Sequence, residues 1–129
     1  MRRLNILLVL FISVSLLSSC EKYEEGGTLY NAEKKISATL WKIESATDLE
    51  DGSDITNDFI GELWEFTEAN EFKINSEFKG NYAFSSDLTA LYISNFNGTE
   101  ADLYMVDRLD KEALWLTMVE ELELHFIPN

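Results

Sequence analysis

The chain has 129 residues and is strongly acidic, with 24 Asp and Glu residues against 10 Lys and Arg residues and a formal net charge of −14. This acidic excess argues against a nucleic-acid-binding protein, because phosphate backbones attract basic surfaces. It is typical of a surface that keeps a protein in solution, and it would also attract a basic protein partner. The length suits one folded domain.

The first residues have the layout of a secretory signal peptide. Arg2 and Arg3 precede an apolar run at residues 6–17, and Ser18 and Ser19 follow it. The run is shorter than the roughly 20 residues that a helix needs to cross a bilayer. We therefore expect residues 1–19 to be removed. Their loss takes away two positive charges and changes the net charge from −14 to −16.

The segment Leu17-Ser18-Ser19-Cys20 resembles the lipobox of bacterial lipoproteins, in which an aliphatic residue and two small residues precede a cysteine. The resemblance implies cleavage before Cys20, a diacylglycerol group on its sulfur, and a fatty acyl group such as palmitate on the new N-terminus. Two or more acyl chains hold a protein stably at a membrane. The alternative is an ordinary signal peptide with a chance cysteine. Cys20 is the only cysteine, so no internal disulfide can form.

Residues 20–30 are expected to be the lipidated cysteine and a flexible tether, since residues 21–27 (EKYEEGG) are polar and end in two glycines. The lysine followed by acidic residues resembles the export signals of some outer-membrane lipoproteins of Gram-negative bacteria. That resemblance implies attachment to the outer membrane and leaves open which face displays the domain. A plain solvated spacer is the alternative. The folded domain is expected at residues 31–129.

Residues 31–37 are expected to form a short helix, with Asn31 as its N-cap and Glu33 in its first turn. From there on, the alternation of apolar and polar residues has the period of two that is typical of β-strands. Eight such runs lie at residues 38–45, 60–67, 71–76, 80–84, 88–96, 101–109, 112–118 and 121–127. The run at residues 88–96 is apolar on both faces, so its inward set is left open.

The connections between these runs are short, which predicts antiparallel neighbours. Asn70 suits a turn with positive φ, and Asn97-Gly98 is typical of a two-residue hairpin. Eight antiparallel strands with one apolar face are expected to close into a barrel, because closure removes exposed edges. The predicted fold is therefore an all-β, up-and-down meander that forms a small eight-stranded barrel, and a two-sheet sandwich is the alternative.

Several segments between Ile36 and Ile127 together resemble a known family. They are Leu40-Trp41-Lys42-Ile43, Phe66-Thr67 with Phe72, Gly80-Asn81-Tyr82, and residues 104–116. The chain is similar here to the small lipocalin-like domains of bacterial lipoproteins. It departs from their pattern at Thr39-Leu40 and at Asn70, where the family usually has glycine. The resemblance implies a barrel, without a particular ligand or activity.

Six aromatic residues predicted to face inward could line a pocket for a small apolar ligand: Trp41, Trp64, Phe66, Phe72, Tyr82 and Phe84. In a barrel of short strands the same rings could instead form a packed core. The sequence thus favours a lipid-anchored, non-catalytic binding protein of the cell envelope. The alternative is an acidic protein-interaction module, such as an inhibitor of a cationic enzyme or an accessory subunit of an outer-membrane complex.

No motif points to an enzyme, a cofactor or a metal. The sole histidine, His125, is predicted on the polar face of the last strand, and the sole thiol is expected to be lipidated, so neither suits nucleophilic catalysis or a zinc site. The acidic segment at residues 46–59 does not have the spacing of an EF-hand loop. Whether it binds calcium is left open. Trp115 is expected to face away from the core.

Overall fold

The structure is a computed structural model that describes residues 29–95 and 97–129. The predicted signal peptide at residues 1–19, the predicted lipidation site Cys20, and the tether up to residue 28 lie outside the described residues. Among the residues described, neither helix has the length and apolar character needed to cross a membrane.

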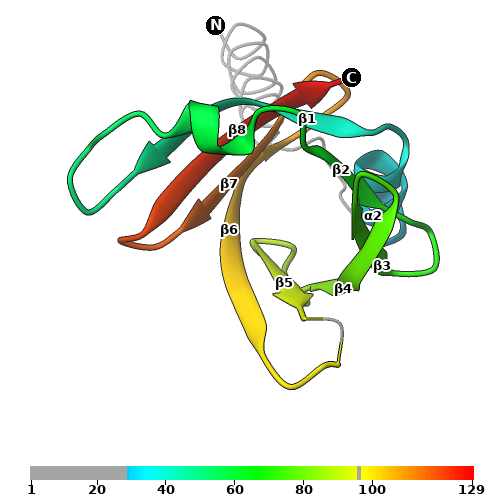
Figure 1. The fold of residues 1–129 in the computed structure, drawn as a ribbon. Coiled ribbons are helices and arrows are strands. Elements are labelled where there is room, and N and C mark those ends of the chain that lie inside the picture. Colours follow the sequence, from blue (N-terminus) through cyan, green and yellow to red (C-terminus); the bar gives the residue numbers. More distant parts are fainter. Residues whose placement is uncertain (1–28, 96) are drawn as a thin grey trace, which may run out of the picture.

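The described chain forms two short helices and eight strands. In chain order they are α2 (Leu29–Ser37), β1 (Trp41–Asp48), the 3-10 helix η1 (Thr56–Phe59), β2 (Leu63–Phe66), β3 (Glu71–Ile74), β4 (Glu77–Phe84), β5 (Ala90–Ser94), β6 (Ala101–Leu109), β7 (Leu114–Met118) and β8 (Leu122–Pro128). Each strand pairs with the next one in antiparallel fashion, and β8 pairs with β1, so the sheet is a closed barrel (Figure 1). The predicted meander and barrel are confirmed, and the alternative of a sandwich is wrong.

The β1–β8 pairing closes the barrel. Its register runs from Trp41 opposite Pro128 to Asp48 opposite Leu122. A bulge between Ile43 and Ser45 shifts the alternation, so that Ala46 is the next buried residue after Trp41 on this strand. Closure leaves neither terminal strand with a long unpaired edge.

The β1–β2 connection is more ordered than the sequence predicts. β1 pairs with β2 only at Trp41 and Lys42. Farther along β1, the chain folds back on itself: Ile55 N donates to Ala46 O at 2.9 Å and Asp48 N donates to Ser53 O at 2.9 Å. Pairing with β8 extends β1 to Asp48, so the prediction of an acidic loop that begins at residue 46 is wrong by three residues.

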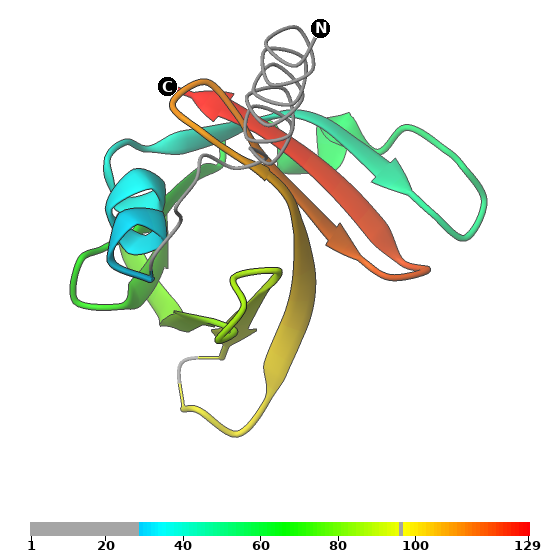
Figure 2. The ribbon, with the colours of Figure 1, turned by 180° about the vertical axis from the view of Figure 1, so that it is seen from behind.

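Helix α2 lies at one end of the barrel, over one side of it (Figure 2). Its buried side chains, Ala32 and Ile36, belong to the core, and Trp41 Nε1 donates to Ile36 O at 2.9 Å. The helix begins at Leu29, so the prediction that Asn31 is the N-cap and that Glu33 lies in the first turn is wrong. Glu33 instead accepts a hydrogen bond from Asn70 Nδ2 at 3.1 Å, which ties the helix to the β2–β3 turn.

The alternation predicts the inward faces correctly. Trp41, Phe72, Leu124 and Phe126 are buried, and Ile43, Ile74 and Leu122 pack partly buried against them. On β5, which the sequence left open, Leu91 and Ile93 are buried and Tyr92 is exposed.

The β5–β6 connection differs from the predicted two-residue hairpin. It spans residues 95–100 and is closed by the bond from Asn95 N to Glu100 O at 2.9 Å. The Asn95 side chain accepts a bond from Thr99 N at 2.9 Å, which stabilises a longer turn in which Gly98 has a φ of 72°. The Asn70 turn is as predicted, with a φ of 63°.

Gly80 lets β4 approach the end of β5. A Cβ atom at this position would lie 1.8 Å from Ser94 O, which is backbone and has little freedom to move. We expect Gly80→Ala to lower the free energy of unfolding by roughly 3 kcal/mol, because overpacking forces the strands apart. Gly98→Ala is the control, since Gly98 has positive φ but open space around it; it should cost only about 1 kcal/mol. If urea unfolding shows that the two variants lose the same free energy of unfolding, the steric argument for Gly80 is contradicted.

Candidate binding sites at the two ends of the barrel

The six aromatic residues proposed as a ligand pocket form one continuous cluster inside the barrel. Five of them are buried, and Phe84 is half-buried. Their ring centroids lie 5.0 Å apart for Trp64 and Phe72, 5.2 Å for Phe66 and Phe72, 5.2 Å for Phe66 and Tyr82, and 6.3 Å for Tyr82 and Phe84. Tilted and edge-on pairs at these distances are typical of packed aromatic cores.

The polar atoms of these rings are also paired within the protein. Trp41 Nε1 donates to Ile36 O, Trp64 Nε1 to Glu62 Oε1 at 2.9 Å, and the Tyr82 hydroxyl to Thr67 O at 2.7 Å. Burial raises the pKa of Tyr82 to about 12, with the negative charges of Glu33 and Glu68 adding to the effect. Since a buried polar group is costly unless it is hydrogen-bonded, these pairs favour the packed-core interpretation of the six rings.

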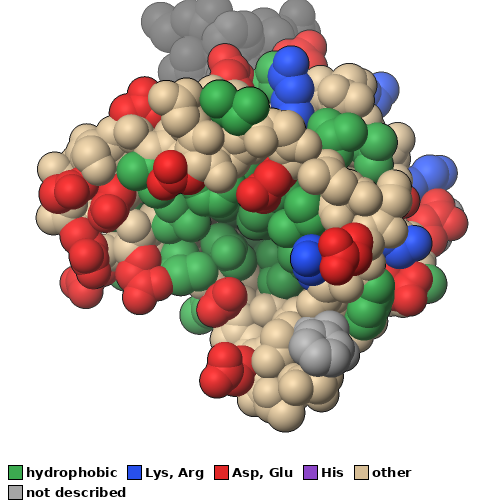
Figure 3. All heavy atoms as spheres, in the orientation of Figure 1, with side chains coloured by type: hydrophobic (Ala, Val, Ile, Leu, Met, Phe, Trp, Pro, Cys, Tyr) green, Lys and Arg blue, Asp and Glu red, His purple; other side chains and the backbone are tan. Residues whose placement is uncertain are grey.

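We call the barrel end opposite α2 the mouth; the β1–β2, β3–β4, β5–β6 and β7–β8 connections lie there. Figure 3 looks onto it and shows hydrophobic side chains gathered in a central hollow, with Asp and Glu side chains around them. The partly buried apolar residues on strand segments that end at the mouth are Ile74, Met118 and Leu122. Residues 49–62, 75–76, 97–100 and 119–121 contain no Lys or Arg. They do contain Glu50, Asp51, Asp54, Asp58, Glu62, Glu100, Glu120 and Glu121.

A recess of about 210 Å³ lies at one side of the mouth. Its walls combine apolar and polar residues from β3, β4, β5 and β6: Phe72, Lys79, Ile93, Ser94, Asn95, Glu100 and Asp102. Phe72 and Ile93 belong to the core, so core residues form part of the wall of the recess. Lys79 lies 3.5 Å from Glu77, which offsets its charge.

Tyr104 does not line this recess and lies two residues farther along β6 than Asp102, on the inward face of the strand. Asp102 pairs with Ile93 and Tyr104 with Leu91 in the β5–β6 register, so both side chains are on the same face of β6. Tyr104 is 6% exposed. Burial raises the pKa of Tyr104 to about 12, and the negative charges of Asp102 and Glu121 raise it further.

The Tyr104 hydroxyl differs from the other buried polar atoms of the aromatic core. Among the described residues, no group is within hydrogen-bonding geometry of it, whereas Trp41, Trp64 and Tyr82 each have a partner. Tyr104 was not among the residues predicted from the sequence to bind a ligand. The alternation of residues 101–109 could have placed it inside, but only the structure reveals that its hydroxyl lacks a protein partner.

The α2 end carries a different recess. A groove of about 500 Å³ runs between the helix and the β6–β7 turn, and it is lined by Asn31, Lys34, Lys35, Ala38, Thr39, Trp41, Asp110, Lys111 and Pro128. Beneath the helix, a space of about 30 Å³ is lined mainly by apolar side chains, including Phe84, Leu88 and Val106. This end carries lysines and acids together, whereas the connections at the mouth carry acids alone.

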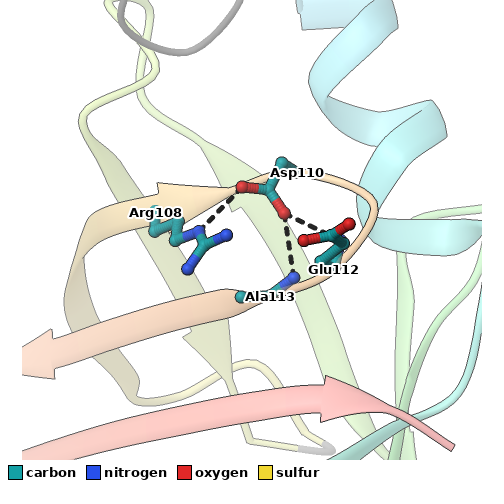
Figure 4. A network of polar contacts seen from close by, with 4 residues as sticks. All are labelled: Arg108, Asp110, Glu112 and Ala113. Atoms are coloured by element: carbon teal, nitrogen blue, oxygen red, sulfur yellow. Dashed lines mark hydrogen bonds and ion pairs between the residues drawn. The ribbon is translucent and has the colours of Figure 1, made fainter.

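The β6–β7 turn beside this groove is held by one carboxylate (Figure 4). Asp110 Oδ2 accepts from Arg108 Nε at 2.7 Å, and Oδ1 accepts from the backbone N–H groups of Glu112 and Ala113 at 2.7 and 2.9 Å. Partial burial opposes ionisation of Asp110, but these hydrogen bonds and the charge of Arg108 outweigh it and lower the pKa.

The outer face of β6, β7 and β8 carries a stack of aromatic and basic side chains. The Trp115 and His125 rings are parallel, with centroids 4.3 Å apart, and the Arg108 guanidinium lies 5.1 Å from the Trp115 ring. His125 Nε2 lies 2.7 Å from Glu123 Oε1. Trp115 and His125 thus face away from the core, as the alternation predicts.

The acidic residues of the β1–β2 connection bond mainly to their own chain. Asp48, Asp51 and Asp54 each accept a hydrogen bond from the backbone N–H two residues later, at 2.9 Å. Bonds of this kind are typical of Asx turns. In the part of the chain that the structure describes, no three Asp, Glu, His or Cys side chains are grouped so that they could hold a metal ion.

No family model matches the sequence, and no curated protein is significantly similar to it. The closed eight-stranded antiparallel barrel with one short helix is consistent with a lipocalin-like barrel.

Asp110 gives a pH-dependent contribution to stability. We expect Asp110→Asn to lower the free energy of unfolding at pH 7 by about 1 kcal/mol, the scale of one hydrogen bond to a charged group that is partly exposed. Because the pKa of Asp110 is lower in the folded state, its contribution is complete above the unfolded pKa of about 3.9 and is lost as the pH falls through the folded value. Urea unfolding at pH 7 and pH 2.5 measures this.

The control is Glu112→Gln, because the Glu112 side chain makes none of these bonds and only its backbone N–H does. If Asp110→Asn lowers the free energy of unfolding by the same amount at pH 7 and at pH 2.5, the carboxylate charge does not have the role assigned to it.

Proposed function

We propose that this protein is a lipid-anchored binding protein of the bacterial cell envelope, and that its barrel holds a small ligand with an apolar body at the mouth. The observation that carries the proposal is the apolar hollow at that end (Figure 3), together with the mouth recess, whose wall includes Phe72 and Ile93 of the core. Ligand sites are usually concave and mostly apolar, with a few polar groups.

The packed aromatic cluster supports a ligand position above the rings and not among them. Trp64 contacts both Phe72 and Phe126, with centroids 5.0 Å apart in each pair. Displacing such rings would cost several contacts. A recess of about 210 Å³ suits a short hydrocarbon chain or one ring.

The anchor in this proposal is Cys20, with acyl chains added as the lipobox resemblance implies. The first described element after it is α2, which begins at Leu29 and lies at the barrel end opposite the mouth (Figure 2). A tether that ends at this helix would leave the mouth directed away from the membrane surface.

Ligand binding can be tested with N-phenylnaphthylamine, a neutral apolar dye that becomes fluorescent in apolar surroundings. We expect the full mature chain to bind it and Ile74→Trp to weaken binding at least about tenfold, because the larger side chain fills the mouth. Ile74 is half-buried at the mouth end of β3.

The matched control is Lys73→Trp, which adds the same ring to the neighbouring outward position on β3. The proposal is overturned if the dye does not bind to folded protein, or if both variants bind it as the parent does. Circular dichroism melting curves establish that each variant is folded.

The anchor gives a separate prediction. Cys20→Ser should move the protein from the membrane fraction to the soluble fraction and abolish the incorporation of labelled palmitate, because no sulfur remains to be lipidated. Ser18→Ala is the control, since it keeps a small residue before Cys20. Retention of Cys20→Ser in the membrane fraction would contradict the anchor.

The acidic connections at the mouth also fit the second candidate function, a protein-interaction module for a basic partner. That role requires association that weakens as salt is added. A salt-sensitive complex that survives in Ile74→Trp would favour this second function over the small ligand.

A further inference from the structure

A chemical class for the ligand follows from the polar groups at the mouth, if the site proposed above exists. Below the mouth, a phenol hydroxyl without a protein partner faces the interior, on Tyr104, which is 6% exposed. A native protein rarely leaves such a group unpaired without a reason, because a buried hydroxyl gains nothing that replaces its lost water. A ligand group that bonds to the phenol would supply that reason.

The charges around this hydroxyl are negative. Asp102 is on the same face of β6, nearer the mouth, and it lines the recess together with Glu100. Glu121 is in the β7–β8 connection, and its charge, like that of Asp102, acts on the Tyr104 phenol. The one basic residue of the recess, Lys79, is already beside Glu77.

A carboxylate or phosphate head group would be repelled at this place, whereas a cation would be attracted, the more so because the surroundings are partly apolar. A protonated amine has several N–H donors, and a phenol oxygen can accept one of them while carboxylates accept others.

We propose that the ligand is an apolar amine, with its hydrocarbon part in the hollow and its protonated nitrogen at the mouth near Asp102 and Glu121, bonded to the Tyr104 hydroxyl. The buried phenol binds the polar end of the ligand. The carboxylates favour a positively charged ligand over a negatively charged one.

The test compares octylamine, octanol and octanoate, which share one hydrocarbon chain and differ in the charge of the head group. Isothermal titration of the full mature chain at low salt should give octylamine the tightest binding, at least about tenfold tighter than octanoate. Tyr104→Phe should weaken octylamine binding about three- to tenfold, the equivalent of one hydrogen bond. Asp102→Asn should weaken the binding of octylamine and leave that of octanol unchanged.

Two controls match these variants. Tyr92→Phe removes the hydroxyl of an exposed tyrosine on the outer face of β5, and Glu112→Gln neutralises an exposed carboxylate at the α2 end. Neither should change octylamine binding. Equal affinity for the three compounds, tighter binding of octanoate, or full octylamine affinity in Tyr104→Phe and Asp102→Asn would overturn this inference alone. If none of the three compounds binds, the proposed function fails as well.

A measurement without ligand tests the unpartnered hydroxyl itself. Tyr104→Phe should leave Tm unchanged or raise it by about 2–4 °C, because it removes a buried polar group that has no bond to lose. Tyr82→Phe is the matched contrast, since it removes the bond to Thr67 O and should lower Tm. If Tyr104→Phe lowers Tm as much as Tyr82→Phe does, the hydroxyl has a partner in the protein and the inference is wrong.

Discussion

The pairing of the first strand with the last creates both ends of this barrel, and each candidate site depends on it. β1 and β8 pair along their whole length, from Trp41 opposite Pro128 to Asp48 opposite Leu122. An open meander of the same strands would expose two edges and spread its aromatic residues over one flat face. Once the sheet is closed, the inward side chains converge on one axis, and the recesses at the two ends become distinct from the outer surface.

The two ends are then completed differently. At one end α2 packs Ile36 into the core, and the bond from Trp41 Nε1 to Ile36 O fixes the helix to β1. At the mouth, the described residues form only connections between strands, together with η1, whose Phe59 packs partly buried on the core. Polar side-chain atoms in the interior near the helix are therefore covered by protein. Those near the mouth have fewer hydrogen-bond partners in the protein. Tyr82, bonded to Thr67 O, and Tyr104 illustrate this difference on neighbouring parts of the same core.

The period of two in the sequence is sufficient to predict the strand order, the closure and most inward residues, because one face of each strand must be apolar. It fails where a side chain or an extra backbone bond changes the local path. Asn95 lengthens the β5–β6 turn through its bond from Thr99 N, and pairing with β8 extends β1 beyond its predicted end. The period of two also cannot distinguish aromatic rings that pack against one another from rings that line a ligand site. The alternation of apolar and polar residues predicts that Tyr104 and Phe66 both face inward. Only the contacts around each ring in the structure distinguish them.

Charged side chains are distributed differently at the two ends of the barrel. The α2 end carries basic and acidic residues together, such as Lys34, Lys35 and Asp110, whereas the connections at the mouth carry acids and no basic residue among the positions described. If acyl chains on Cys20 hold the protein, the α2 end would lie nearest to the membrane, and the acidic mouth would be repelled from anionic head groups. The strongly acidic composition then has a physical use beyond solubility. In that arrangement the mouth would face the aqueous phase, and its acidic residues would attract cations.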